Sequence, residues 1–300
     1  MSGEVGALLA AACWAVSFTI FTAQTRRLGP LSVNTVRSLF AALFILLLAP
    51  FFGSLGELRE MSLSTLVALV GSGVLAMGVG DSLFFASLPL MGASRAIPIS
   101  NGLYPLLALL LAAVWLDEKV TVLILLGTAL VIAGVTLLVG ESAPSVEGNA
   151  TGGAAAARGR GKKGFFLLVA ACVAWAVSTN WLKAGGGDAD VVAAATIRVV
   201  INGLILLPMA YLWEGKRDLL GNGLRDTVAL AVAGIVGIGI GSLLYLFAVQ
   251  EAGAGKTAVL TSTLPLFALP LAVIFLKEKI TPKVLLGTTL CMLGIWLVAV

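Results

Sequence analysis

The chain has 300 residues, of which 59% are hydrophobic and 11% are charged, and its formal net charge is +4. A soluble domain carries about a quarter charged residues, so this many apolar side chains cannot be buried in one soluble core. The mean hydropathy of +1.07 excludes a soluble globular protein and indicates a chain embedded in lipid. Histidine is absent, which removes the usual imidazole proton relay and most zinc chemistry, so we expect neither a metal nor a cofactor.

Apolar blocks alternate along the chain with short charged or Gly/Pro-containing segments. A helix of about 20 residues crosses a hydrocarbon core of about 30 Å. The blocks lack the alternation of membrane barrels, and a helix satisfies its backbone groups within its own segment. The sequence therefore predicts an all-α polytopic membrane protein with ten transmembrane helices, at about 5–24, 31–52, 63–88, 94–116, 120–140, 165–184, 190–213, 226–250, 256–276 and 281–300.

One long segment, residues 141–163, is not apolar. Gly, Ala, Ser and basic residues dominate it, as is typical of a flexible linker. It divides the chain into a first five-helix unit, residues 1–140, and a second, residues 164–300. The three cysteines lie inside apolar blocks, where we expect them to be small packing residues and not a disulfide framework.

The two units repeat the same residues in the same order. The stretch WAVS occurs at 14–17 and again at 175–178, and an arginine stands twenty residues after each copy, at Arg37 and Arg198. The stretch LDEK before the fifth helix recurs as LKEK in the second unit. Because five is odd, the second unit enters the membrane from the opposite side. This arrangement is an inverted-topology repeat, which places equivalent residues around a shared site near the midplane.

The distribution of basic residues predicts the orientation in the membrane. With these ten helices, thirteen Lys and Arg residues fall on the side of the linker and four on the other. The richer side is expected to be cytoplasmic, which places both termini outside. We therefore expect a multi-pass protein of the plasma (inner) membrane. The same bias accounts for the net positive charge, and we see no nucleic-acid patch.

Three duplicated features resemble a known family. They are the Trp-x-x-Ser of each half, the arginine in each second helix, and a proline followed thirteen residues later by glutamate (Pro105 and Glu118, Pro265 and Glu278). With ten spans and a duplicated five-helix unit, the chain resembles the EamA family of the drug/metabolite transporter superfamily. The resemblance covers both halves and misses only the linker. It implies a secondary transporter of small metabolites, in which the first, third and fourth helices of each half surround a cavity and the fifth packs behind.

Asp81 is the only carboxylate that we place well inside a span. An acid at the centre of a membrane helix costs about 2.5–3.5 kcal/mol on insertion, so it should face the cavity or pair. It is a candidate proton acceptor or ligand for a substrate amine. The alternative is a hydrogen-bonded packing residue or one near the interface. We place Gly241 as its counterpart in the second half, so any role is one-sided.

Arg37 and Arg198 lie about 10 Å deep in their helices. They are candidates to anchor a substrate carboxylate, with snorkelling or a structural ion pair as the alternatives. The predicted orientation places Arg37 and Glu278 towards the cytoplasm, and Arg198 and Glu118 towards the outside. Any ion pair should therefore cross between the halves, joining Arg37 to Glu278 and Arg198 to Glu118.

The remaining candidates line the predicted cavity. Trp14 and Trp175 are expected to form facing walls, although membrane tryptophans more often mark interfaces. Pro105 and Pro265 lack the amide that would bond four residues back, and free carbonyls are tolerated where they line a cavity. The alternative is an ordinary proline kink. The polar residues assigned to substrate binding with the two tryptophans are Ser17, Ser178, Ser100, Asn101, Tyr104, Tyr245, Thr261, Ser262 and Thr263.

Glycines recur seven residues apart on both fifth helices, at 127 and 134 and at 287 and 294. Small residues at this spacing permit close helix packing, either in the scaffold or at a homodimer face. The stretch GAGKT at 253–257 is not a phosphate loop, because the required first glycine falls at Gln250.

The leading functional hypothesis is export of a small, partly apolar metabolite such as an amino acid. The two bundles would expose their shared cavity to each side in turn, either uncoupled or linked to protons through Asp81. The alternative is a membrane-embedded enzyme such as a lipid or prenyl transferase. That chemistry needs clustered acids or histidines, and one intramembrane aspartate with no histidine argues against it.

Overall fold

In the computed structural model, helices make up the fold, and no strand occurs among the residues that the structure describes. These residues are 1–24, 28–91, 93–142, 154–215, 223–268 and 281–300. The prediction of an all-α polytopic membrane protein is confirmed.

The helices of the first half follow the predicted order of spans. The third span is divided into three parts, because a π-helical stretch separates two α-helices. The elements are α1 (Gly3–Gln24), α2 (Pro30–Leu48), η1 (Ala49–Phe52), α3 (Ser54–Glu60), α4 (Leu63–Gly73), η2 (Val74–Gly80), α5 (Asp81–Met91), α6 (Ala93–Trp115) and α7 (Val122–Ser142).

The second half repeats this order, again with a π-helical stretch in its third span. Its elements are α8 (Ala154–Gly186), α9 (Val191–Trp213), α11 (Leu224–Ala233), η3 (Gly234–Ile240), α12 (Gly241–Ala252), α13 (Ala254–Thr261) and α15 (Pro282–Ala299).

Local sequence signals place several of the helix starts. Asp190 accepts a hydrogen bond from the amide of Ala193 at 2.8 Å and so caps α9. Ser62 caps α4 in the same way, through the amide of Thr65. Pro30 and Pro282 occupy the first helical positions of α2 and α15, where a missing amide costs nothing.

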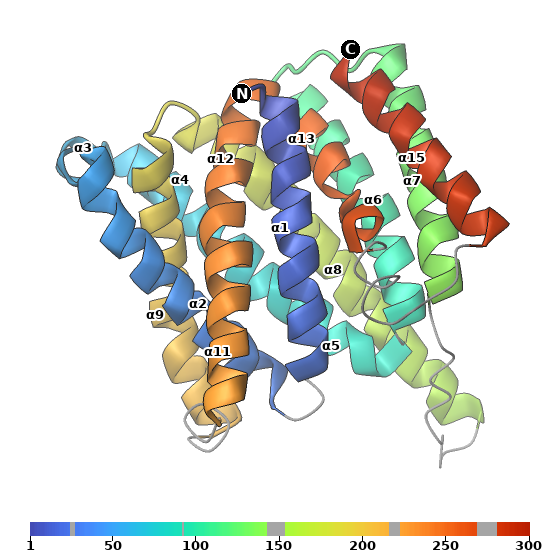
Figure 1. The fold of residues 1–300 in the computed structure, drawn as a ribbon, viewed down its shortest axis with the longest axis horizontal. Coiled ribbons are helices and arrows are strands. Elements are labelled where there is room, and N and C mark those ends of the chain that lie inside the picture. The colour runs from blue at the N-terminus through green and yellow to red at the C-terminus, as the bar shows by residue number, and fades with distance from the viewer. Residues whose placement is uncertain (25–27, 92, 143–153, 216–222, 269–280) are drawn as a thin grey trace.

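Seven of the described helical stretches are long and apolar enough to cross a membrane. Ile99–Trp115 and Val122–Leu137 are shorter apolar helices. The predicted ninth span, 256–276, extends beyond the described residues. Both termini lie at the upper end of the bundle in Figure 1, as an even number of crossings requires.

Large apolar side chains cover the outside of the bundle. Leu47, Val114 and Trp213 are 63%, 83% and 72% exposed, a pattern that suits contact with lipid. The interior is packed with small and aliphatic residues, among them Ala10, Ile45, Leu69 and Leu246 of the largest buried cluster.

Two hydrogen bonds join the halves in a reciprocal way. The hydroxyl of Ser17 on α1 donates to the carbonyl of Ala233 at 2.9 Å, and that of Ser178 on α8 donates to the carbonyl of Ser72 at 2.7 Å. Donors and acceptors are each 161 positions apart in the sequence (17 to 178, 72 to 233). The first helix of each half thus bonds to the third span of the other half.

Glycines bring each third span against the other half at matching positions. A Cβ atom at Gly80 would lie 2.6 Å from the indole nitrogen of Trp175, and one at Gly241 would lie 2.8 Å from that of Trp14. Gly80 and Gly241 are therefore equivalent. It follows that the counterpart of Asp81 is Ser242, and the sequence assignment to Gly241 was one residue off.

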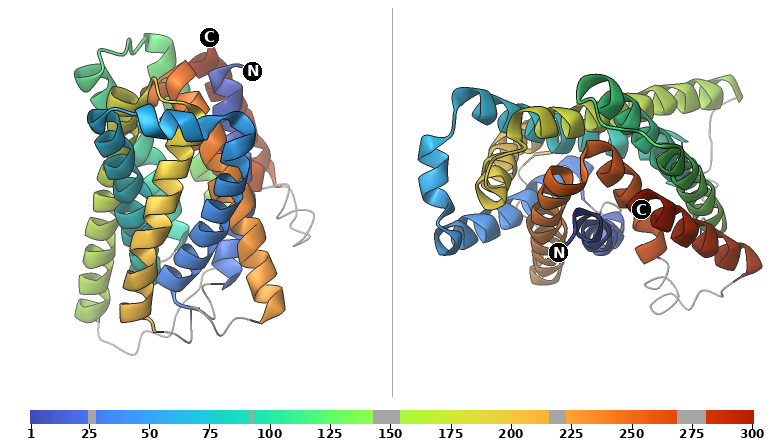
Figure 2. Two further views of the ribbon diagram at one scale, coloured as in Figure 1. Left: turned by 90° about the vertical axis from the view of Figure 1, so that its left-hand side faces the viewer. Right: turned by 90° about the horizontal axis from the view of Figure 1, so that it is seen from above.

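The fifth helices, α7 and α15, pack directly on each other at one edge of the bundle (Figures 1 and 2). A Cβ atom at Gly134 would lie 2.6 Å from the carbonyl oxygen of Gly287, and one at Gly294 would lie 2.6 Å from that of Gly127. The two helices therefore run antiparallel with their backbones in close approach. The glycines of α7 thus pack against the glycines of α15 within one chain. They have the scaffold role, which was one of the two alternatives from the sequence.

The three cysteines are free thiols, and Cys172 and Cys291 are buried. Cys172 and Cys291 therefore pack in the interior as expected, whereas Cys13 is partly exposed. A Cβ atom at Gly134 would also lie 2.7 Å from the sulfur of Cys291, which places this thiol inside the α7–α15 contact.

Candidate functional site: a cavity between the two halves

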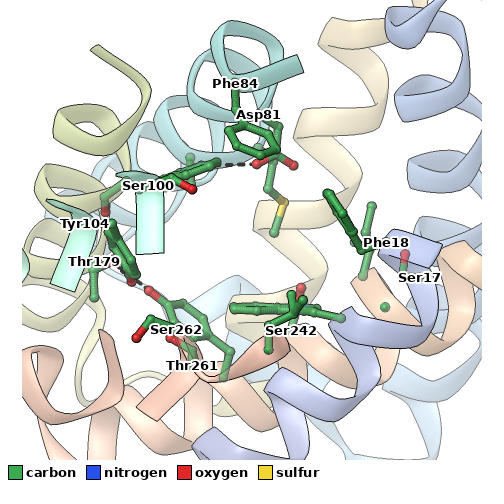
Figure 3. A pocket seen from close by; sticks show the side chains of 18 of the residues that line it. Ser17, Phe18, Asp81, Phe84, Ser100, Tyr104, Thr179, Ser242, Thr261 and Ser262 are labelled. Atoms are coloured by element: carbon green, nitrogen blue, oxygen red, sulfur yellow. Dashed lines mark hydrogen bonds between the residues drawn. The ribbon is translucent and has the colours of Figure 1, made fainter. Parts of the chain in front are cut away.

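A cavity of about 250 Å³ lies between the two halves (Figure 3). From the first half, α1, α2, η2, α5 and α6 contribute to its lining. From the second half, α8, α9, η3 and α12 do so, with residues at the end of α13. Around the open space in Figure 3, Asp81 and Phe84 lie opposite Ser242, Thr261 and Ser262. Polar and charged side chains from both halves therefore line one cavity, which is large enough for a small metabolite.

Aromatic side chains form much of the wall. Trp14 packs against Tyr245 with ring centroids 5.3 Å apart, and Trp175 packs against Tyr104 and Phe84 at 6.0 and 5.4 Å. The two tryptophans thus lie on the same cavity, each beside a tyrosine. Such walls suit a ligand with an apolar or aromatic body.

Asp81 lies at the junction of η2 and α5, where it forms an ion pair with Arg37 on α2. Arg37 Nη2 and Asp81 Oδ2 are 3.1 Å apart, and the side chains are only 9% and 23% exposed. The indole N–H of Trp175, from the other half, donates to Asp81 Oδ1 at 3.1 Å. Both carboxylate oxygens are therefore engaged, one within the first half and one across the halves.

The ion pair with Asp81 gives Arg37 a partner that the sequence analysis did not propose, while its predicted pairing with Glu278 stays a prediction. Arg37 was expected to reach Glu278 in the other half, because the predicted orientation places both residues towards the cytoplasm. Two turns of different helices bring Arg37 and Asp81 together on the cavity wall, with Asn34 Oδ1 as a further acceptor for the guanidinium at 2.9 and 3.1 Å. Glu278 lies outside the described residues.

Arg198 on α9 has no carboxylate partner among the described residues, which corrects its predicted pairing with Glu118. Its guanidinium donates to the hydroxyl of Ser72, and its side chain lines the cavity although the residue is only 2% exposed. Glu118 instead accepts hydrogen bonds from the amides of Ala254 and Gly255 at 2.7 and 3.0 Å. Glu118 does cross between the halves, but its partner is the first turn of α13, whose free amides attract a carboxylate.

Thr179 on α8 connects the two cavity tyrosines. Its hydroxyl lies 2.7 Å from the hydroxyl of Tyr245 and 3.2 Å from that of Tyr104, and it also donates to the carbonyl of Trp175. Sequence reasoning chose its neighbours and missed Thr179. Its position one helical turn after Trp175 was the available signal, since residues four apart share a helix face.

Most residues assigned to substrate binding from the sequence lie together on this cavity, but two do not. Ser178 and Thr263 are absent from its lining, because each is fully packed and bonds to a carbonyl, at Ser72 and Leu260. The assigned residues that do line it are Trp14, Ser17, Asp81, Ser100, Asn101, Tyr104, Trp175, Tyr245, Thr261 and Ser262.

The fourth spans of the two halves differ around their repeated proline, Pro105 in the first half and Pro265 in the second. Helix α6 continues through Pro105 to Trp115, whereas α13 ends at Thr261, and helical structure resumes at 264–268 around Pro265. The break expected from proline thus occurs in the second half alone. There, Thr261 and Ser262 satisfy carbonyls of the preceding turn through their hydroxyls, at 2.7 Å each.

Comparison with known proteins agrees with this architecture. The family model of the EamA-like transporter family matches residues 1–140 and 162–300. The chain belongs to the EamA-like transporter family.

Relatives of this EamA-like chain are named as transporters. A protein from Archaeoglobus fulgidus, named an uncharacterized transporter, is 29% identical over 97% of this chain and 95% of its own length. The uncharacterized transporter YvbV of Bacillus subtilis is 26% identical over 65% of this chain and 59% of its own length. These names and the family support a membrane transporter.

A solved crystal structure of another protein shows the same fold. It superimposes with a TM-score of 0.79 at 17% sequence identity, and the match covers 98% of this chain and 95% of the other. At this identity the likeness concerns the fold alone.

The cavity of the EamA-like chain is built mainly from the first, third and fourth spans of each half. Among the described residues, none of α7 or α15 lines it. The second helix of each half adds one lining residue, Arg37 or Arg198. The two repeated arginines therefore enter the site from α2 and α9, and Asp81 enters it from the start of α5.

Proposed function

We propose that the chain is a secondary transporter that exports small amphipathic metabolites, amino acids or related compounds, across the plasma membrane. The observation that carries the proposal is the cavity of about 250 Å³, which both halves line with aromatic, hydroxyl and charged groups. Its volume is slightly below the range of about 300–1,000 Å³ that is typical of drug-sized ligand sites, which suits a small metabolite and not a polymer.

Reciprocal contacts between the halves support alternating access as the mechanism. The Ser17–Ala233 and Ser178–Ser72 hydrogen bonds join equivalent positions, as two bundles related by inverted topology would. Each third span contains a π-helical stretch beside the cavity, Val74–Gly80 and Gly234–Ile240. Such stretches interrupt the regular hydrogen bonding of a helix and often occur at functional sites, so they are the places where each span would bend.

The orientation of the transporter follows from the basic residues. We place the linker, residues 141–163, in the cytoplasm and both termini outside, with residues 1–140 and 164–300 as the two bundles. Reporter fusions at the C-terminus and within the linker test this placement. A cytoplasmic signal from the C-terminal fusion would overturn this placement.

Flux into proteoliposomes tests the proposed function. Purified protein is reconstituted, and counterflow of radiolabelled amino acids, amines and organic acids is measured against empty liposomes. Ala76→Trp would place a large side chain in the cavity and should abolish flux. Leu47→Trp, on the exposed outer surface, is the matched control and should leave flux unchanged. Equal flux in protein-free liposomes, or full flux through the filled cavity, would reject the proposal.

The coupling of transport to protons is a second measurement on the same preparation. Asp81 is the one carboxylate among the described residues that line the cavity, so proton-linked transport should require it. Flux driven by an imposed pH gradient is compared between wild type and Asp81→Asn. Loss of the pH-driven component with retained counterflow indicates coupling through Asp81. Unchanged pH-driven flux assigns the coupling elsewhere.

A further inference from the structure

The charges on the cavity wall do not balance. Its described lining holds two arginines, Arg37 and Arg198, and one aspartate, Asp81, which is already paired with Arg37. Among the described residues no carboxylate pairs with Arg198, which thus keeps an uncompensated positive charge while it is only 2% exposed. A desolvated charge without a counterion is costly, so such a residue calls for an anionic partner.

The repeat explains where the missing partner would stand. Ser242 occupies, 161 positions later, the place of Asp81, and the two arginines are separated by the same 161 positions. One half therefore places a carboxylate on the cavity wall for its arginine, and the other half places a neutral hydroxyl. Ser242 lines the cavity and has no hydrogen-bond partner among the described residues, so its hydroxyl is available to a ligand.

The donors of Arg198 are mostly available as well. A guanidinium carries five N–H donors, and the structure gives Arg198 one hydrogen bond, to the hydroxyl of Ser72. The planar fork of its remaining donors matches the two oxygens of a carboxylate. Ser72 holds the arginine from the side of α4, leaving the cavity side for the ligand.

From this imbalance we infer that the substrate of the proposed transporter carries a carboxylate that binds Arg198 and Ser242, with its apolar body against the aromatic walls. The inference rests on the proposed function and narrows its substrate class to organic acids and amino acids. It separates the two arginines: Arg37 is neutralised by the protein, and Arg198 is neutralised by the substrate. Amines without a carboxylate are then not substrates.

A matched set of ligands tests the charge that the cavity selects. The probes are 3-phenylpropionate, its neutral amide 3-phenylpropionamide, phenylalanine and 2-phenylethylamine, which share one phenyl ring. Binding to purified protein is measured by calorimetry in detergent. The two probes with a carboxylate, 3-phenylpropionate and phenylalanine, should bind about tenfold to a hundredfold more tightly than the amide. This is the gain expected when a carboxylate accepts hydrogen bonds from a charged guanidinium. Tighter binding of the amine, equal binding of acid and amide, or binding of none of the probes would overturn the inference.

Variants then assign the selectivity to Arg198. Arg198→Gln should abolish the preference for acid over amide while the amide still binds, and Arg198→Lys should retain part of the preference. Arg59→Gln removes an exposed arginine that does not line the cavity and serves as the control, which should keep the preference. If the folded Arg198→Gln protein retains the full ratio of acid to amide affinity, the inference is wrong.

A further variant tests the explanation from the repeat. Ser242→Asp supplies the carboxylate that the second half lacks, so it should raise the melting temperature and abolish binding of 3-phenylpropionate. Ser242→Asn, of similar size without the charge, should do neither. A Ser242→Asp protein that binds the acid as wild type does would refute the assignment. The flux assay tests the transporter proposal separately, because counterflow of any substrate class supports it. If the protein transported only amines, the proposed function would stand and only the inference of a carboxylate substrate would be wrong.

Discussion

The indole of Trp175 donates a hydrogen bond to Asp81 at 3.1 Å, and the two residues belong to different halves of the chain. The other oxygen of Asp81 binds Arg37 of its own half. Asp81 is therefore a joint between the halves on the wall of the cavity. A motion of one half against the other would strain or break the hydrogen bond between Trp175 and Asp81. Trp175, Asp81 and Arg37 are therefore the first targets for mutation.

Replacing Trp175 with Phe should weaken the joint while keeping an aromatic wall. The variant loses a hydrogen bond to a charged group that is partly exposed to the cavity, and its free energy of unfolding should fall by about 1 kcal/mol. Thermal unfolding in detergent measures the change. Trp14→Phe is the control, because the indole of Trp14 has no hydrogen-bond partner among the described residues. Equal losses in both variants would show that the bond to Asp81 contributes nothing.

The Arg37–Asp81 ion pair should appear as energetic coupling in a double-mutant cycle. Arg37→Gln or Asp81→Asn alone leaves a charge without its partner, whereas the double variant removes both charges. With side-chain exposures of 9% and 23%, the coupling should lie between surface and buried values, at about 2 kcal/mol. The control cycle pairs Asp81→Asn with Arg198→Gln and should be additive. Coupling below the error of the melting curves would contradict the pair.

Glu118 should stabilise the contact between α13 and the segment that joins α6 to α7. Its carboxylate accepts from the amides of Ala254 and Gly255, so Glu118→Ala should lower the free energy of unfolding by about 1 kcal/mol. Glu118→Gln keeps an acceptor oxygen and should lose less. The neighbouring Lys119 is exposed, and Lys119→Ala should have no effect. If Glu118→Ala melts with the wild type, the contact is not stabilising.

The glycine contact between α7 and α15 should tolerate no side chain. A Cβ atom at Gly134 would lie 2.6 Å from a backbone carbonyl, so Gly134→Ala must push the helices apart, at about 1–3 kcal/mol. At Gly56, on α3, a Cβ atom would meet nothing within 4 Å, and Gly56→Ala should be neutral or slightly stabilising. Melting temperatures of the two variants measure the difference. A Gly134→Ala protein as stable as Gly56→Ala would mean that the helices do not approach so closely.

Several parts of the cavity were predictable from the sequence because they repeat. Trp14 and Trp175, the arginines twenty residues after each WAVS, and the hydroxyls near Pro265 all lie where a duplicated pattern indicates a shared site. Thr179 was missed because its counterpart in the first half, Phe18, is not polar. A residue that only one half uses leaves no duplicated signal.

The sequence by itself determined that the chain is helical, lies in a membrane and is duplicated. Hydropathy in blocks of helical length and the ordered recurrence of residues carry this information along one dimension. Only the tertiary structure decided that Arg37 pairs with Asp81, that Glu118 binds the first turn of α13, and that Arg198 keeps its charge towards the cavity. These partners depend on how each helix is rotated and where helices cross, which is set by packing between segments far apart in the chain.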